Sequence, residues 1–152
     1  MRCGSGSGRA ALRTVAYLLS PLRARLLWQP TMPFLFEKLA VYQRALAFAD
    51  RVSALTAAIP RGSWYLADQL NRASLSISLN IAEGNGRWTH ADRRNFFGIA
   101  RGSVHECVPL IELCKRKSLL AECVSVELKG ELETIAKMLS GLIERQTKPA
   151  TG

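Results

Sequence analysis

The sequence predicts an all-α protein: an antiparallel up-down-up-down four-helix bundle that follows a non-native or disordered N-terminal extension. Apolar residues recur three and four positions apart in four successive segments after residue 32, the repeat of one face of an α-helix. Short breaks that contain Gly, Pro, Ser or Asn separate these segments, and short connections place consecutive helices antiparallel. Only residues 74–81 alternate polar and apolar residues as a strand does, and a single strand would have no sheet to join. We therefore expect one helical domain over residues 32–148.

Residues 1–31 form the expected extension and differ in composition from the rest of the 152-residue chain. They contain five arginines and no acidic residue, a net charge of +5, whereas the following residues have 16 basic and 12 acidic side chains, a net charge of +4. Their apolar runs are short and interrupted by Arg, so the segment does not resemble a secretory signal peptide. Two interpretations stay open: a transit-like segment, or translated sequence upstream of a natural start at Met32. Under both, residues 1–31 lie outside the fold.

The first helix is predicted to end at Pro60 and Gly62, because proline and glycine interrupt helices. Its apolar residues are spaced three and four apart, and we expect this row to face the core. The row consists of Leu39, Tyr42, Leu46, Ala49, Val52, Leu55 and Ile59.

The second helix is predicted to start after Ser63, a residue type that caps helix N-termini, and to run out in residues 84–86. At about 100° per residue, its apolar side chains form two stripes. The stripe expected to face the core consists of Leu66, Leu70, Ala73, Ile77 and Ile81. The stripe almost opposite consists of Leu75, Leu79 and Ala82. One small core cannot bury both stripes, so the second predicts an oligomer interface.

The third helix begins with a capping box, Thr89 and Asp92, and ends in basic residues 115–117, which suit a helix C-terminus. Its core row is Phe96, Ala100, Ser103, Cys107, Leu110 and Cys114. Pro109 should bend this helix without breaking it, because proline removes one backbone hydrogen bond.

The fourth helix begins near Ala121, and its core row is Leu128, Leu132, Ile135, Leu139 and Leu142. Glycines also lie inside the last two helices, each at a cost of about 1 kcal/mol relative to alanine. We expect close backbone contacts at these positions, Gly98, Gly102, Gly130 and Gly141.

The four cysteines predict free thiols. Cys107 and Cys114 are seven residues apart on one helical face, about 10 Å along the axis, which is too far for a disulfide. Cys123 lies near a helix start and Cys3 in the extension, with no C-x-x-C motif. This usage fits a reducing compartment, and no apolar run approaches the roughly 20 residues that span a bilayer. We expect a cytoplasmic protein with no membrane partner.

Catalytic, cofactor and metal sites have little support in the sequence. His90 and His105 have no nucleophile at helical spacing, and no set of His, Cys, Asp and Glu has a usable metal-ligand spacing. We therefore predict no catalytic residue, cofactor, metal or small-molecule substrate.

Asn80 falls beside Ile77 and Ile81 on the core side of its helix, where an amide needs hydrogen-bond partners. Ser103 is the candidate partner, and Glu83 and Arg87 could extend a polar network. A network of this kind fixes helix register. The alternatives are a ligand site or a catalytic pocket lined by the same residues.

A basic stripe along the third helix and its approach is the best sign of a binding surface. It consists of Arg87, His90, Arg94, Arg101 and His105. Such a row can follow the phosphate backbone of RNA or DNA, and the alternative is an ordinary solvated helix face. Trp64 and Tyr65, at the start of the second helix, are expected to be core or interface anchors.

Several segments together resemble a known family. They are R-A-S-L-S-I-S-L-N-I-A-E-G at residues 72–84, Arg87, Phe96-Phe97, Ala100-x-Gly102-Ser103, Glu106, F-E-K-L-A-V-Y-Q-R-A-L at residues 36–46 and K-M-L-S-G-L-I at residues 137–143. This combination resembles the small four-helix-bundle proteins encoded in intervening sequences of bacterial 23S rRNA genes, over residues 34–146. Ser78 and Leu79 depart from the Pro-Ser usual in that family.

The resemblance implies a homopentamer without enzymatic activity. More distant relatives include the accessory proteins of diversity-generating retroelements, which bind nucleic acid and a reverse transcriptase. The family's signature polar positions fall on Asn80, Glu83, Arg87, Ser103 and Glu106. We therefore expect a self-associating, non-enzymatic protein with RNA or DNA as a partner, and a purely structural assembly or protein adaptor as the alternative.

Overall fold

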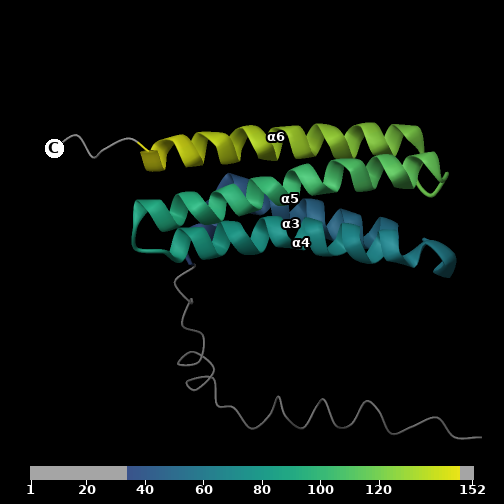
Figure 1. Ribbon diagram of the computed structural model, residues 1–152, viewed down its shortest axis with the longest axis horizontal. Coiled ribbons are helices and arrows are strands. Elements are labelled where there is room, and N and C mark those ends of the chain that lie inside the picture. The colour runs from purple at the N-terminus through teal and green to yellow at the C-terminus, as the bar shows by residue number, and fades with distance from the viewer. Residues whose placement is uncertain (1–33, 148–152) are drawn as a thin grey trace, which may run out of the picture. The chain divides into compact units, whose positions relative to one another are not determined.

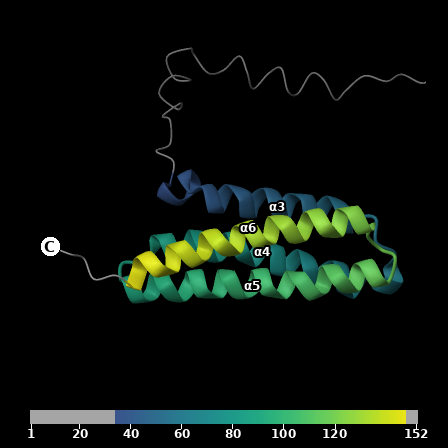
Figure 2. The same ribbon diagram turned by 90° about the horizontal axis from the view of Figure 1, so that it is seen from above.

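The computed structural model describes residues 34–147. Its long helices are α3 (Ala40–Thr56), α4 (Trp64–Gly86), α5 (His90–Arg116) and α6 (Glu122–Thr147), and short 3-10 helices, η1 (Leu35–Lys38) and η2 (Arg61–Ser63), precede α3 and α4. Figures 1 and 2 show the chain reversing at each connection, so that consecutive helices run in opposite directions. Residues 34–147 contain no strand, and the predicted all-α four-helix fold is confirmed. The predicted extension, residues 1–31, lies outside the described part of the chain.

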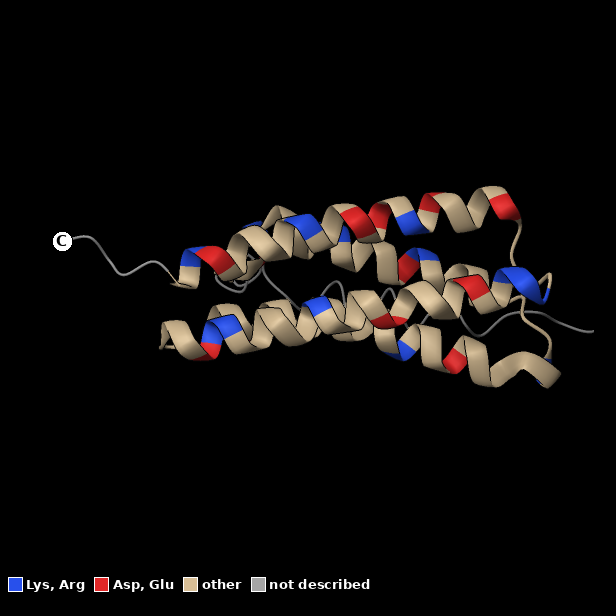
Figure 3. Ribbon diagram, turned by 45° about the horizontal axis from the view of Figure 1, so that its top comes forward, with Lys and Arg blue, Asp and Glu red and all other residues tan. Residues whose placement is uncertain are grey.

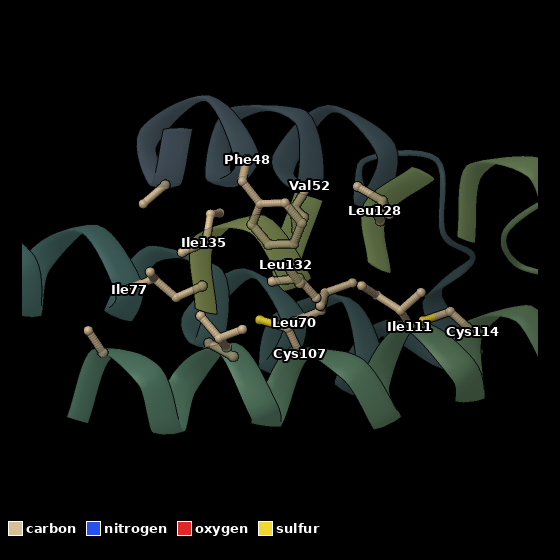
Figure 4. Close-up of a cluster of buried hydrophobic side chains, with 14 of the residues drawn as sticks. Phe48, Val52, Leu70, Ile77, Cys107, Ile111, Cys114, Leu128, Leu132 and Ile135 are labelled. Carbon is tan, nitrogen blue, oxygen red and sulfur yellow. The ribbon is translucent and has the colours of Figure 1, made fainter. Parts of the chain in front are cut away.

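The core lies between the four helices and receives large side chains from each of them. Figure 4 shows these side chains pointing toward one another: Phe48 and Val52 of α3, Leu70 and Ile77 of α4, Cys107, Ile111 and Cys114 of α5, and Leu128, Leu132 and Ile135 of α6. Burial of one such aliphatic or aromatic side chain contributes about 1.5–3 kcal/mol. The core stripe predicted for α4 is buried throughout, and the rows predicted for α5 and α6 are buried except for Phe96, Leu110 and Leu142 at their edges.

The core row predicted for the first helix is wrong in part. The buried residues of α3 are Val41, Ala45, Phe48, Val52 and Thr56, whereas Leu46 is 45% exposed. Apolar residues lie on all sides of this alanine-rich helix, so the spacing alone does not select a face. The face of α3 that packs against the other helices is the one that carries Phe48.

Open space remains between α3 and each of the two helices beside it, α4 and α6. Hollows of about 320 Å³ and about 270 Å³ lie between α3 and α6, and another of about 310 Å³ lies between α3 and α4. Two ion pairs cross the α3–α6 seam, Arg44 with Glu131 at 3.2 Å and Arg51 with Glu127. All four side chains are more than a third exposed, so each pair adds little stability.

The expectation of close backbone contacts at the interior glycines is also wrong. Gly98, Gly102, Gly130 and Gly141 are exposed, and apart from the adjoining residues and backbone of the same helix no atom lies within 4 Å of the position that a Cβ would take on any of them. The glycine in close contact is Gly84, near the end of α4, where a Cβ would lie 2.8 Å from Phe97 Cε1. Sequence alone could not distinguish Gly84 from the other glycines. Phe96 and Phe97 belong to α5, and they contact Gly84 only because the α4–α5 connection brings the two helices together.

The helix ends follow the sequence closely. Thr89 Oγ1 accepts a hydrogen bond from the backbone N–H of Asp92 at 3.0 Å, which confirms Thr89 as the N-cap. The Asp92 carboxylate accepts from the Thr89 hydroxyl at 2.6 Å, so the predicted capping box is formed in its first half only. Ser63 occupies the N-cap of α4 but makes no side-chain capping bond. Pro109 lies on the exposed side of α5, and the helix continues through it as expected.

Candidate functional site

The outer face of α4 carries the apolar stripe predicted as an interface. Leu75 is 48% exposed and Leu79 is 57% exposed, while Ala82 is half-buried. Leu75 also lines the hollow between α3 and α4 together with Leu46. Both leucines lie mid-helix and on the side away from Ile77, so the fold of one copy leaves about half of each side chain exposed.

The predicted polar network is divided along the α4–α5 seam. Asn80 donates to the backbone oxygen of Ser76 at 2.8 Å and to its hydroxyl at 3.0 Å, and that hydroxyl lies 2.9 Å from Ser103 Oγ. Ser76 therefore joins Asn80 to Ser103, and sequence reasoning missed it. Its position four residues before Asn80, on the same side of the helix, was the available signal.

The other members of the predicted network form separate pairs. Arg87 pairs with Glu83 one helical turn earlier, and its guanidinium lies over the Phe96 ring at 4.4 Å. Glu106 accepts a hydrogen bond from Gln69 at 2.5 Å, another partner that the sequence did not indicate. These groups bridge α4 and α5, a geometry that fixes the register of the two helices.

The predicted basic stripe is also divided. Arg94, Arg101 and His105 are exposed within a narrow arc of α5, roughly 40° wide at about 100° per residue. His90 lies on the same side but makes a 2.7 Å hydrogen bond with Gln146 of α6. Arg87 turns instead toward Phe96 and Glu83. Arg94 and Arg101 have no acidic partner within residues 34–147.

Several acidic residues form ion pairs elsewhere in the bundle. Figure 3 shows acidic and basic residues interspersed along the helices. At the far end of α5, Glu112 contacts Lys129, Arg116 and Lys115, and hydrogen bonds from them, led by that from Lys129, lower the pKa of Glu112 to about 2. The pKa of Lys115 is raised, mainly by its bond to Glu112. Glu127 and Glu131 pair with α3.

The predicted core thiols are confirmed. Cys107 and Cys114 are free and buried, and Cys123 is free and exposed. Burial, with a smaller contribution from the charge of Glu106, raises the pKa of the Cys107 thiol to about 12. A thiol with this pKa is protonated at neutral pH and is a poor nucleophile or metal ligand. Cys3 lies outside the described residues.

The geometry offers little to the catalytic alternative. Asn80, Glu83, Arg87 and Ser103 are hydrogen-bonded along the α4–α5 seam, and the three hollows described beside α3 are lined by other residues. Residues 34–147 hold no group of three His, Cys, Asp or Glu side chains that could bind a metal ion. Within the same range, no helix has both the length and the apolar character needed to cross a membrane.

Four aromatic side chains of residues 34–147 are exposed, Phe34, Trp64, Tyr65 and Trp88. Trp64 and Tyr65, expected as core or interface anchors, are not part of the core, because each is more than 60% exposed. Trp88, in the α4–α5 connection, is 96% exposed. An interface role for Trp64 and Tyr65 stays a prediction.

Comparisons with known proteins identify the family. The family model described as 23S rRNA-intervening sequence protein matches residues 37–141. Among solved structures, the chain is similar to a protein of unknown function from the S23 ribosomal protein family of Bacteroides thetaiotaomicron VPI-5482, with 24% identity and a TM-score of 0.64 over 68% of this chain and 95% of that one. A comparison with the curated proteins gives no match. Because the family model spans all four helices, the chain belongs to the 23S rRNA-intervening sequence protein family.

Proposed function

We propose that the protein is a non-enzymatic, cytoplasmic homo-oligomer, a pentamer as its family resemblance implies, that binds nucleic acid through the exposed basic side of α5. The observation that carries nucleic-acid binding is the row of Arg94, Arg101 and His105, which no acidic side chain of residues 34–147 neutralises. Cations spaced along a helix suit successive phosphates of a nucleic-acid backbone. Assembly would repeat the row in every copy and multiply its effect.

Self-association is supported by the outer face of α4. Leu75 and Leu79 expose apolar surface in the middle of a helix whose other side is fully buried. Exposed apolar patches on soluble proteins mark interaction sites. The double variant Leu75→Glu with Leu79→Glu should remain helical by circular dichroism but lose the assembled mass. An unchanged mass would contradict this role.

The first experiment is native mass spectrometry of the protein with co-purified nucleic acid retained, which reports stoichiometry and ligand together. Binding to single-stranded and folded RNA and to DNA is then measured across a salt series. Phosphate contacts predict that log affinity falls linearly with log salt concentration. Affinity that does not change with salt would contradict the proposal.

A single charge reversal locates the surface. Arg101→Glu should weaken binding and reduce the salt slope by about 1, as expected for one lost phosphate contact. Arg145→Glu is the matched control, because it changes the net charge equally on an exposed position of α6. Equal losses in both variants would indicate attraction to net charge alone and would contradict a surface on α5.

A purely structural or adaptor function is the second candidate, and the exposed Trp64, Tyr65 and Trp88 favour it. Tryptophan and tyrosine are enriched among residues that dominate protein interfaces. Wild-type protein that assembles but binds none of the tested nucleic acids would favour this function over the first.

A further inference from the structure

The outer faces of α4 and α5 are complementary in shape. On α4, Leu75 and Leu79 project four residues apart from the exposed side. On α5, Gly98 and Gly102 are also four residues apart and exposed, with no atom within 4 Å of either Cβ position. A hollow of about 480 Å³ adjoins this surface and is lined by Ala91, Arg94, Asn95, Gly98 and Ile99. One helix therefore has two apolar projections, and the other has space at the same spacing.

The charges that flank these residues are complementary as well. Along α4 the order is Arg72, Leu75, Leu79, Glu83, and along α5 it is Arg94, Gly98, Gly102, Glu106. The two series span about 17 Å and about 18 Å at 1.5 Å per residue. Laid antiparallel, the series bring both leucines against the two glycines. The same alignment brings Arg72 to Glu106 and Glu83 to Arg94.

Most of these charges lack an opposite charge inside one copy. Within residues 34–147, Arg72 and Arg94 form no ion pair, and Glu106 has a hydrogen bond from Gln69 but no basic partner. Glu83 pairs with Arg87 and keeps 49% of its side chain exposed. The antiparallel alignment would therefore give Arg72, Arg94 and Glu106 the opposite charge that each lacks in one copy, and would place a second arginine beside Glu83.

The alignment also suits a closed ring. The α4 and α5 helices run antiparallel in one copy (Figure 1). Rotation about an axis parallel to the bundle leaves helix directions unchanged, so α4 of one copy meets α5 of the next antiparallel. A contact between two different faces is heterologous and closes into a ring when the rotation divides a full turn.

We propose that copies of this chain join head-to-tail, with the Leu75–Leu79 face of α4 seated on the Gly98–Gly102 face of α5 in the next copy. This contact rests on the proposed self-association and specifies its two surfaces. At about 100° per residue, Arg94 and His105 then lie beside the contact, whereas Arg101 lies farther around α5 and stays available to nucleic acid.

The first test fills the α5 face. Gly98→Glu with Gly102→Glu adds two exposed side chains to a helix and should preserve its helicity, as far-ultraviolet circular dichroism would verify. Native mass spectrometry should then give monomers at concentrations where the wild type is assembled. The matched variant Gly130→Glu with Gly141→Glu, on exposed positions of α6, should assemble as the wild type does. Wild-type assembly of the Gly98→Glu, Gly102→Glu variant would overturn the proposal.

The second test exchanges charges across the contact. Arg72→Glu alone and Glu106→Arg alone should each raise the concentration for half-dissociation on the order of tenfold, because each places like charges together. The double variant should restore assembly, since every contact in a ring pairs position 72 of one copy with position 106 of the next. A double variant that is as dissociated as the single variants would overturn the proposal.

The wild-type mass separates this proposal from the proposed function. A wild type that is monomeric at every concentration would refute self-association itself. If the wild type assembles and the Gly98→Glu, Gly102→Glu variant assembles equally well, only the head-to-tail contact is refuted. Pairing of two α4 faces would then be indicated. Assembly only with a different protein would likewise overturn it.

Discussion

Replacing Gly84 with alanine should destabilise the bundle, because the added methyl group has no space. Its Cβ would lie 2.8 Å from Phe97 Cε1, 3.0 Å from Phe97 Cδ1 and 3.0 Å from Phe96 Cβ. Favourable carbon–carbon contacts lie at about 3.5–4.0 Å, so the overlap is several tenths of an ångström or more. Phe97 is buried, and Phe96 supports the Arg87 guanidinium, so neither ring can move freely.

The expected loss follows from two opposing effects. Overpacking a well-packed site costs about 1–3 kcal/mol, and alanine gains up to about 1 kcal/mol over glycine inside a helix. Gly84 lies two residues before the end of α4, where that gain is smaller. The Gly84→Ala variant should therefore be less stable than the wild type by about 1–2 kcal/mol, from the difference of these terms.

Urea unfolding followed by circular dichroism, at equal protein concentrations, measures this loss. Gly130→Ala is the control, because Gly130 is exposed within α6 and nothing lies within 4 Å of its Cβ position. It should gain up to about 1 kcal/mol from helix propensity alone. The two substitutions are thus expected to have opposite signs. A Gly84→Ala variant at least as stable as the wild type would refute the contact described between α4 and the start of α5.

Two further predictions concern titratable groups. The pKa of Glu112 falls from an ordinary 4.5 to about 2 in the folded protein, so its contribution to stability is present above about pH 4.5 and is lost as the pH falls toward 2. The stability difference between wild type and Glu112→Gln in urea should therefore shrink from pH 6 to pH 3, and a constant difference would contradict the assigned ion pairs. In a Cys3→Ser background, a thiol reagent should label Cys123 rapidly and Cys107 and Cys114 only after unfolding. Rapid labelling of more than one thiol by intact-mass analysis would show that the core is open.

The sequence predicted most of the core because three of the helices concentrate their large apolar residues on well-separated rows. In α4, Ile77 and Ile81 fall on one row, and Leu75 and Leu79 almost opposite, so the two stripes could be told apart. In α3, alanines and larger apolar residues surround the helix, and only contact with other helices selects Phe48 over Leu46.

The candidate surfaces were less predictable because they depend on the connection between α4 and α5. Arg87 was placed in the basic row with Arg94 by position in the sequence, but the connection directs it toward Phe96. The bond between Ser76 and Ser103 joins residues 27 positions apart, and ordinary serines in helices give no signal of such a partner. Local periodicity predicts which face of a single helix is apolar. Predicting contacts between two helices also requires the register in which they pack, which the sequence does not give directly.

The hollows and exposed ion pairs along α3 have a consequence for local unfolding. Backbone amides near weakly packed seams exchange with solvent through openings that cost less free energy than global unfolding. The α3–α6 seam has two hollows, and salt screens the small contribution of its exposed ion pairs, Arg44–Glu131 and Arg51–Glu127. By contrast, α4 and α5 pack against each other through buried side chains. Native-state hydrogen exchange should therefore find α3 opening first, and more often at high salt, while α4, α5 and α6 stay protected. In that case α3 would separate from the bundle at a lower free-energy cost than global unfolding, while α4, α5 and α6 remain packed together.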